Sequence, residues 1–322
     1  MRVSVVIPFY NRVELLRDSI GSVLAQTRPA DEIVVVDDRS PEDTSWLPLE
    51  FPTVRILRLP RNMGPMRARY EGVATTTGTH VATLDMDDIW YPQKLEKQIA
   101  YAEKTADSRA IYTHLQWVNE GETGSVRPQK LLQPGEPLGD YFYVRNESLQ
   151  TNTFLVERTL YLQLAHIAEG YYAEDMELLL EAEARHCRIY IQEEVLSQWN
   201  CLPDPRRGSY AYDETHLRRL LRDQGMHLTP KAQAAFKGRA LARCLAEQGQ
   251  YGEAGKMLWE AVSSQALSPV MATKLTLLTL FPGAFRRAAG LYRRFAPSRQ
   301  TAPTATVAKS ECSALGAFSK KL

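Results

Sequence analysis

The stretch Val81-Ala82-Thr83-Leu84-Asp85-Met86-Asp87-Asp88 decides the predicted fold of this chain. Its apolar run leads directly into three carboxylates, which is typical of a buried strand that ends at a polar edge of a sheet. Crowded carboxylates repel one another unless a cation compensates them, and this favours a divalent metal ion at this point. The alternative is a polar turn, in which Asp88 caps a helix over residues 92–104. Taken alone, the stretch leaves both interpretations open.

The segments that precede this stretch alternate between strand patterns and helix patterns. Apolar runs at residues 3–7 and 32–36 predict strands, of which the second has the continuous pattern of a strand buried on both faces, and residues 54–59 are predicted to form a third strand. The alternation predicts an α/β fold of the Rossmann-like kind, with a mostly parallel central sheet flanked by helices. In such sheets ligands bind outside the carboxyl ends of the strands. We therefore expect Asp38 and residues 85–88 to converge at one edge.

A local negative field of this kind needs a partner that carries positive charge or hydrogen-bond donors. A metal-chelated diphosphate would supply the cation, and a nucleobase or ribose would donate hydrogen bonds to the remaining carboxylate. Arg61, Arg67 and Arg69 lie between the two acidic strand ends in the sequence. Each could equally be a solvated helix residue, and we expect at most two of them to touch a ligand. Arg69 is our candidate for binding the nucleotide sugar.

Five ordered segments resemble the nucleotide-sugar domain of glycosyltransferase family 2, the inverting, metal-dependent class with the GT-A fold. Five blocks in order are far more specific than a lone Asp-x-Asp pair. The segments are Val3-Ser4-Val5-Val6-Ile7-Pro8-Phe9-Tyr10-Asn11-Arg12, Ser22-Val23-Leu24-Ala25-Gln26-Thr27, Glu32-Ile33-Val34-Val35-Val36-Asp37-Asp38-Arg39-Ser40, Arg61-Asn62-Met63-Gly64 and Leu84-Asp85-Met86-Asp87-Asp88.

The resemblance implies a role for each residue at the predicted sheet edge. Pro8, Tyr10 and Asp38 are expected to hold the nucleobase, usually uracil, and Asp85 is expected to approach the ribose. By the same resemblance Asp87 is the ligand of Mn²⁺ or Mg²⁺ on the diphosphate.

A second group of acids follows Gly170-Tyr171-Tyr172-Ala173 and opens a predicted helix. Acids in a first turn are favoured by the helix dipole, so capping is one interpretation. Transfer to a sugar hydroxyl needs a general base, and the resemblance assigns this role to Asp175, with Glu174 in support. Arg206 and Arg207 are further candidates for meeting the leaving phosphate, although the local sequence does not match the family.

We predict a GT-A catalytic domain over residues 1–204. Its nucleotide-sugar-binding half covers residues 1–107, and its acceptor-binding half covers residues 108–204. A helical extension over residues 205–296 follows. The polar, aromatic-poor residues 297–322 are expected to be disordered.

Two features of the extension suggest partners. Residues 236–269 resemble a single tetratricopeptide-like hairpin with Gly249 at its turn, and such a hairpin packs on its own chain or on a protein partner. Residues 273–295 mix apolar residues with Lys and Arg. A basic amphipathic helix of this kind can lie on an anionic membrane, and a helix that covers the core with a solvated basic face is the alternative.

Bulk composition excludes several classes of protein. The 39 basic and 38 acidic residues give a net charge of +1, which does not support nucleic-acid binding. Neither a signal peptide nor a membrane span is predicted, so we expect a cytoplasmic protein, with peripheral contact at the inner face of the cytoplasmic membrane as a hypothesis. The four cysteines are scattered, which argues against a disulfide framework and a zinc site.

Together these patterns predict an inverting glycosyltransferase that uses a nucleoside-diphosphate sugar, with UDP as the expected nucleotide. The acceptor is expected to be a saccharide, lipid-linked or protein-linked hydroxyl in bacterial polysaccharide or glycolipid synthesis. Two alternatives stay open. One is a nucleotidyltransferase acting on a sugar phosphate, and the other is a non-catalytic nucleotide-sugar-binding or helical-repeat adaptor.

Overall fold

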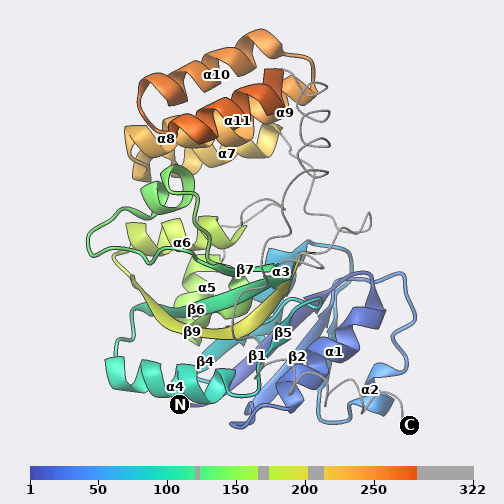
Figure 1. Cartoon of the computed structure of the whole chain (residues 1–322). Helices are drawn as coiled ribbons and strands as arrows, with labels where there is room; N and C mark the ends of the chain where they lie inside the picture. Colours follow the sequence, from blue (N-terminus) through green and yellow to red (C-terminus); the bar gives the residue numbers. More distant parts are fainter. Residues whose placement is uncertain (120–123, 166–173, 202–213, 281–322) are drawn as a thin grey trace. The chain divides into compact units, whose positions relative to one another are not determined.

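The computed structural model describes residues 1–119, 124–165, 174–201 and 214–280. Within these residues nine strands form one mixed sheet in the order β3-β2-β1-β4-β8-β6-β9-β5, and β7 pairs with β6 (Figure 1). Met1–Leu280 form one compact unit.

The first four strands are the parallel part of the sheet, as the apolar runs predict. Neighbouring pairs β3 and β2, β2 and β1, and β1 and β4 are all parallel. The core strands β1 and β2 are buried almost throughout, in agreement with a sheet covered on both faces. The four strands are β1 (Val3–Phe9), β2 (Glu32–Asp37), β3 (Arg55–Arg58) and β4 (His80–Thr83).

The second part of the sheet is mixed. β8 runs antiparallel to both β4 and β6, β9 runs parallel to β6, and β5 and β7 form antiparallel pairs with β9 and β6. These strands are β5 (Ile89–Trp90), β6 (Ala110–Asn119), β7 (Gly124–Arg127), β8 (Leu155–Glu157) and β9 (Arg188–Asn200).

Helices cover both faces of the sheet, because the side chains of each strand alternate between two apolar clusters. Val5 and Ile7 of β1 face a cluster that also holds residues of α1, α2 and α4. Val6 faces the opposite cluster, which holds residues of α3, α5 and α6. These helices are α1 (Val13–Leu24), α2 (Leu47–Glu50), α3 (Pro65–Ala74), α4 (Lys94–Thr105), α5 (Arg158–Ala165) and α6 (Glu174–Ala184).

The proline of β1 lies inside the strand, whereas the apolar run of the sequence suggests a strand that ends there. Val6 accepts a hydrogen bond from the N–H of Leu84, whereas Phe9 accepts one from Asp38. The backbone N–H and C=O groups of even-numbered residues of β1 therefore point toward β4. The partner strand β4 ends at Thr83, which lies opposite Val6. Pro8 lies beyond that end, so its missing N–H removes no hydrogen bond from the ladder.

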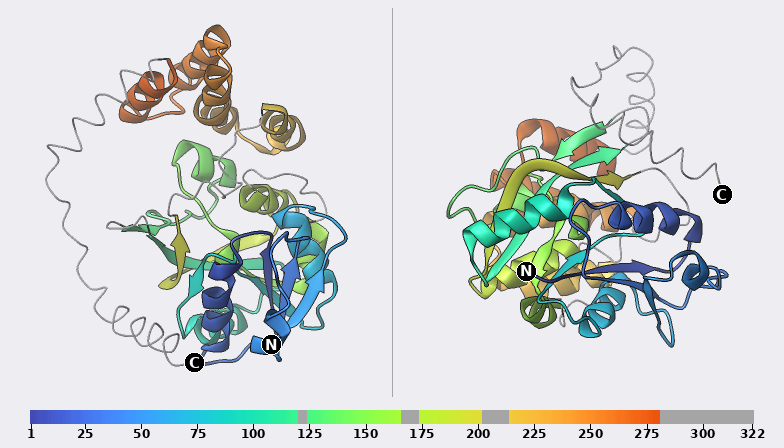
Figure 2. Two further views of the ribbon diagram at one scale, coloured as in Figure 1. Left: turned by 90° about the vertical axis from the view of Figure 1, so that its right-hand side faces the viewer. Right: turned by 90° about the horizontal axis from the view of Figure 1, so that it is seen from below.

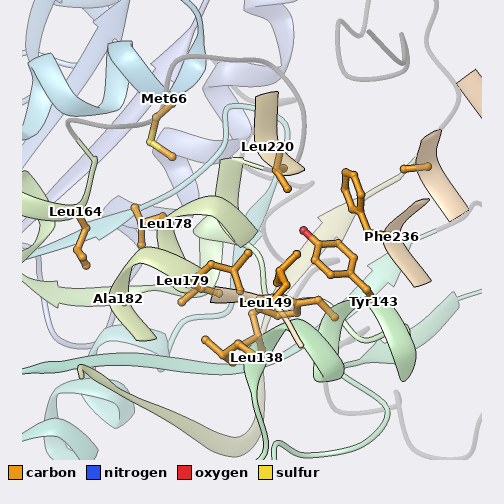
Figure 3. Close-up of a cluster of buried hydrophobic side chains, with 14 of the residues drawn as sticks. Met66, Leu138, Tyr143, Leu149, Leu164, Leu178, Leu179, Ala182, Leu220 and Phe236 are labelled. Carbon is orange, nitrogen blue, oxygen red and sulfur yellow. The ribbon is translucent and has the colours of Figure 1, made fainter. Parts of the chain in front are cut away.

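Of the helices after β9, α8, α9 and α11 each pack against α10, whereas α7 packs against α6 and η5 (Figure 2). The apolar cluster under α6 continues into them, and Figure 3 shows Leu178 and Leu179 of α6 in the same cluster as Leu220 and Phe236. The predicted extension thus shares apolar core with the central sheet, and the division at residue 204 stays a prediction. These helices are α7 (Glu214–Gln224), α8 (Pro230–Phe236), α9 (Ala242–Glu247), α10 (Tyr251–Ser263) and α11 (Pro269–Leu280), with short turns η4 (Gly225–His227) and η5 (Lys237–Leu241) between them.

A helical hairpin lies where the sequence predicts one. Gly249, with φ of 80°, joins α9 to α10 in a left-handed conformation that suits glycine. A Cβ atom on Gly238 would stand only 2.6 Å from the Cβ of Ala261, so a small residue is required at this crossing. The likeness of this hairpin to a tetratricopeptide unit stays a prediction.

Of the predicted basic stretch at residues 273–295, only the part up to Leu280 is described, within α11. The remainder and the tail at residues 297–322 lie outside the described residues. Among the helices that the structure describes, none is long and apolar enough to cross a membrane.

Candidate active site

The carboxyl ends of β1, β2 and β4 meet at one edge of the sheet, because the three strands are parallel neighbours. This edge carries the β1–α1 loop, Asp38 after β2, and the three acids after β4. The predicted convergence of the two acidic strand ends is confirmed.

The loop between β1 and α1 is held by a carboxylate from another segment. The two oxygens of Glu42 accept the backbone N–H groups of Arg12 at 2.9 Å and Val13 at 2.7 Å. Glu42 thereby caps α1, and Arg12 takes a left-handed conformation with φ of 58°. Of the two residues predicted to hold the nucleobase here, Tyr10 lies in the loop and is 40% exposed, whereas Pro8 lies within β1 and is buried. The contact of either residue with a nucleobase stays a prediction.

Asp38 is buried and holds the loop that follows β3. Its two oxygens accept the N–H groups of Met63 at 2.7 Å and Gly64 at 2.8 Å. Burial raises the pKa of the Asp38 carboxyl, the nearby Asp37 acts in the same direction, and the two backbone donors oppose the shift. A carboxylate has about four acceptor positions, so Asp38 retains capacity for a further donor such as a uracil N–H. Its predicted contact with the nucleobase stays a prediction.

The backbone conformation in which Gly64 donates its N–H to Asp38 requires a glycine at this position. Its φ of 85° and ψ of 161° fall in a region that is essentially restricted to glycine. We expect Gly64→Ala to lower the free energy of unfolding by about 1–3 kcal/mol, the usual cost of such backbone strain. Equilibrium urea unfolding measures the change.

Gly255→Ala in α10 is the control for this experiment, since a Cβ atom there meets nothing within 4 Å. Alanine is the better helix former, so this control should gain about 0.5–1 kcal/mol. Equal effects of the two substitutions would contradict the assigned role of Gly64.

Asp85 is paired with a buried arginine of α3. Nη2 of Arg69 donates to Oδ1 of Asp85, and the Arg69 side chain is only 3% exposed whereas that of Asp85 is 30% exposed. Arg69 reaches this position because Gly72 lets α3 lie close to the sheet: a Cβ there would stand 2.6 Å from the side chains of Val6 and Val36. Arg69 therefore orients Asp85, and the partly exposed carboxylate is the surface that a ribose could contact.

Asp87 is also paired with an arginine. Nη2 of Arg12 lies 3.0 Å from Oδ2 of Asp87, and the two side chains are 10% and 9% exposed. The described residues show no group of three or more His, Cys, Asp or Glu side chains that could enclose a metal ion. A magnesium ion on a nucleotide is usually held by one or two carboxylates together with the phosphates. Asp87 alone would have to serve a metal ion whose other ligands are phosphate oxygens, and its predicted role as a metal ligand stays a prediction.

Asp88 does not cap the following helix, and that interpretation of the sequence is wrong. α4 begins at Lys94 with Gln93 at its N-cap. Asp88 is instead buried: Oδ1 accepts the N–H of Asn200 at 2.9 Å, and Oδ2 accepts Nδ2 of Asn152 at 2.6 Å. Nδ2 of Asn200 also donates to the backbone oxygen of Asp87. Asp88 thus ties the acidic turn to β9 and to the short turn η2 (Thr151–Thr153).

The proposed general base lies at the start of α6. Glu174 is the first residue of this helix, and Asp175 follows it with a partly buried side chain. α6 packs against α5 and α7. Residues 170–172 and the candidates Arg206 and Arg207 lie outside the described residues. The roles of Asp175 and Glu174 stay predictions.

A buried polar contact joins α6 to α7. Nε2 of His216 lies 2.9 Å from Oε1 of Glu177, and the two side chains are 9% and 11% exposed. Burial, and after it the charge of Glu177, raises the pKa of the neighbouring Tyr143. The helix that carries the candidate base Asp175 in its first turn is therefore held by a polar contact with α7 as well as by apolar packing.

Three residues at this edge escape prediction from the sequence. Arg12, Asn152 and Asn200 each contact one of the acids after β4, yet they come from three separate segments. Arg12 stands only at the end of a matching block, and no spacing or periodicity marks any of the three. Only their contacts in the folded protein identify these three residues.

The sheet is mixed and not mostly parallel as predicted, because among the strands that the structure describes only the first four and the pair of β6 and β9 are parallel. A mixed sheet that collects these acids at the carboxyl edge of its parallel half is typical of the GT-A fold. The structure is similar to that of the S. aureus TarS 1-349 fragment crystallised with UDP-GlcNAc, with a TM-score of 0.62 over 93% of each chain at 17% identity. The likeness shows the fold.

Sequence comparison relates the amino-terminal half of the chain to a protein family. Residues 4–160 match the family model described as glycosyl transferase family 2. An uncharacterized glycosyltransferase of Rickettsia felis is 35% identical over 125 residues, which are 38% of this chain and 20% of the relative. The chain thus spans about a fifth of the length of that relative.

Two further relatives carry names that describe an activity or a process. UDP-Glc:alpha-D-GlcNAc-diphosphoundecaprenol beta-1,3-glucosyltransferase WfgD of Escherichia coli is 36% identical over 133 residues, which are 40% of this chain and 52% of WfgD. TuaG of Bacillus subtilis, whose name places it in teichuronic acid biosynthesis, is 35% identical over 103 residues, or 31% of this chain and 41% of TuaG.

Proposed function

We propose that this protein is an inverting glycosyltransferase that transfers a sugar from a UDP-linked donor to a hydroxyl acceptor. The proposal rests on one observation above all: a family 2 domain whose parallel strands bring Asp38, Asp85 and Asp87 to one sheet edge. The names of WfgD and TuaG support a place in bacterial cell-envelope polysaccharide or glycolipid synthesis. The TarS complex with UDP-GlcNAc supports UDP as the nucleotide.

On the donor side, we assign the nucleobase to Pro8, Tyr10 and Asp38, and the ribose to Asp85. Arg69 acts by holding Asp85 in position. Asp87 is the proposed protein ligand of Mn²⁺ or Mg²⁺, and such an ion would neutralise the charge that develops on the leaving diphosphate.

On the acceptor side, the attacking hydroxyl oxygen approaches the anomeric carbon opposite the diphosphate. The new carbon–oxygen bond forms while the bond to the diphosphate breaks, and the bonding electrons leave with the diphosphate. Asp175 takes the proton of the hydroxyl group, and Glu174 supports it. A single displacement of this kind inverts the anomeric centre.

The acceptor is a saccharide, lipid-linked or protein-linked hydroxyl in this proposal. A cytoplasmic location, with the basic residues 273–295 in peripheral contact with the membrane, would bring the site to lipid-linked acceptors. The hairpin of α9 and α10 is the proposed surface for a protein partner. Its Trp259 is 71% exposed.

The alternative of a nucleotidyltransferase is less favoured by the loop after β1. Such enzymes use a glycine-rich, basic loop there. In this chain the end of β1 and the following loop read Pro8-Phe9-Tyr10-Asn11, and the next residue, Arg12, pairs with Asp87. A non-catalytic binder has no need of a general base. A loss of transfer on substitution of Asp175 therefore distinguishes the proposed function from that alternative.

The test is Asp175→Asn, which keeps the size of the side chain and removes the base. Transfer should fall by about 10²–10⁴-fold, because a general base contributes about that much. UDP release during turnover gives the rate, and calorimetry should show UDP affinity unchanged. A screen of nucleoside-diphosphate sugars by the same assay identifies the donor.

Asp223→Asn on the exposed end of α7 is the control and should retain the full rate. Turnover by Asp175→Asn at the rate of the control would contradict the assignment of the base. If the unaltered protein showed neither turnover nor UDP binding, the proposed glycosyltransferase activity would be contradicted.

A further inference from the structure

The pairing of Arg12 with Asp87 places a protein cation on the carboxylate that the proposed function gives to a metal ion. The 3.0 Å contact is about nine-tenths buried on both sides. Burial of two charges is costly in free energy unless they neutralise each other, so neither partner is readily removed alone. Two arginines of the chain itself thus compensate the acidic edge, with Arg69 on Asp85 and Arg12 on Asp87.

The backbone around Arg12 is fixed independently of its side chain. Glu42 caps α1 by accepting the N–H groups of Arg12 and Val13, and the Arg12 side chain makes no capping hydrogen bond. The guanidinium can therefore change partner through side-chain rotation, without loss of the helix cap. Its planar group of five donors suits two parallel hydrogen bonds to a phosphate.

We propose that Arg12 is the resident counter-ion of Asp87 and is exchanged for a divalent metal ion when a nucleoside diphosphate binds. This inference rests on the proposed function. Asp87 would then hold the ion through its carboxylate, and Arg12 would turn its guanidinium group to the diphosphate.

Charge balance makes the exchange depend on the nucleotide. A divalent ion that arrived alone would have to share one carboxylate with Arg12, and like charges at this distance repel. A diphosphate supplies the negative charge that both cations need. Metal and nucleotide should therefore bind with positive coupling, and linkage requires that each raises the affinity for the other by the same factor.

The first test uses the unaltered full-length chain. Isothermal titration with MnCl₂, in the absence and presence of saturating UDP, should show affinity for Mn²⁺ that is at least about tenfold higher with UDP, within the usual range of such coupling. Paramagnetic resonance of free Mn²⁺ reports the same quantity independently. Equal affinity with and without UDP would overturn the exchange.

The second test removes the counter-ion. Arg12→Gln should bind Mn²⁺ alone about tenfold more tightly than the unaltered protein, and the coupling to UDP should shrink accordingly. Added MnCl₂ should also raise its melting temperature more, because a ligand that binds the folded state stabilises it. Arg12→Lys keeps the charge and should retain most of the coupling.

Arg17→Gln is the matched control, since it removes the same charge from an exposed side chain of α1 that pairs with Glu50. It should titrate like the unaltered protein. Unchanged Mn²⁺ affinity in Arg12→Gln, together with its loss in Asp87→Asn, would overturn the counter-ion role and leave the metal ligand in place. Failure of the unaltered protein to bind UDP at all would instead overturn the proposed function.

Discussion

Replacement of Asp88 by alanine is expected to lower the free energy of unfolding by about 2–6 kcal/mol. The carboxylate is 1% exposed and accepts hydrogen bonds from Asn200 and Asn152. Alanine would leave both donors buried without this acceptor, and each such loss costs about 1–3 kcal/mol. Equilibrium unfolding in guanidinium chloride measures the effect.

A graded series makes this experiment specific. Asp88→Asn retains one acceptor oxygen and should lose about half as much as Asp88→Ala. Asp18→Ala on the exposed face of α1 is the control and should stay within about 0.5 kcal/mol of the unaltered protein. If Asp88→Ala unfolds at the same denaturant concentration as Asp18→Ala, Asp88 does not tie the turn to its neighbours.

The same substitution should also weaken donor binding. Asn200, which Asp88 fixes, donates to the backbone of Asp87. Loss of the tie should therefore displace Asp87 and lower the affinity for UDP in the presence of Mn²⁺. A double-mutant cycle with Asn152→Ala should give a coupling energy of about 0.5–3 kcal/mol, as for other groups in one hydrogen-bond network.

Phe236→Ala is expected to cost about 3–5 kcal/mol, which is typical of a buried phenylalanine. Phe236 is 1% exposed. The centroid of its ring lies 5.0 Å from the centroid of the Tyr143 ring, in an edge-to-face arrangement. Figure 3 shows both side chains in the cluster that also holds Leu179 of α6. Because this core is shared, the substitution should lower the stability of the catalytic sheet together with that of the helices.

The measurement is denaturant unfolding followed by two probes, circular dichroism for the helices and UDP binding for the sheet. Both should give one transition, shifted to lower denaturant in Phe236→Ala. Trp259→Ala, at a 71% exposed position of α10, is the matched aromatic control and should stay within about 0.5 kcal/mol. Loss of the helices with UDP binding intact would mean that the extension unfolds as a separate domain.

The carboxyl-terminal helices are the part of the fold that the sequence predicts least fully, and the reason is physical. Leu217, Leu220 and Phe236 show apolar spacing, which indicates helices but not the surface that they cover. A single hairpin cannot bury its own apolar face, so the sequence leaves its own chain and a partner as alternatives. The structure shows that this face joins the cluster under α6, with Gly139 packed against Leu228 and Ala232.

The sequence by itself determined the strands of the parallel half, their order along the chain and the acids that follow them. These features are local: a continuous apolar run predicts a strand buried on both faces, and parallel pairing brings the carboxyl ends to one edge. For that reason the pattern of apolar runs and acids is enough to place Asp38, Asp85 and Asp87 at a common site.

Only the tertiary structure decided what each acid contacts. Asp87 meets Arg12, Asp85 meets Arg69, and Asp88 joins Asn152 to Asn200, although adjacent positions in the sequence suggest a shared role. Such partners come from segments far apart in the chain, and their positions depend on the register of β4, β8 and β9 and on the close approach of α3. No local pattern encodes these distances, because they result from the packing of the whole domain.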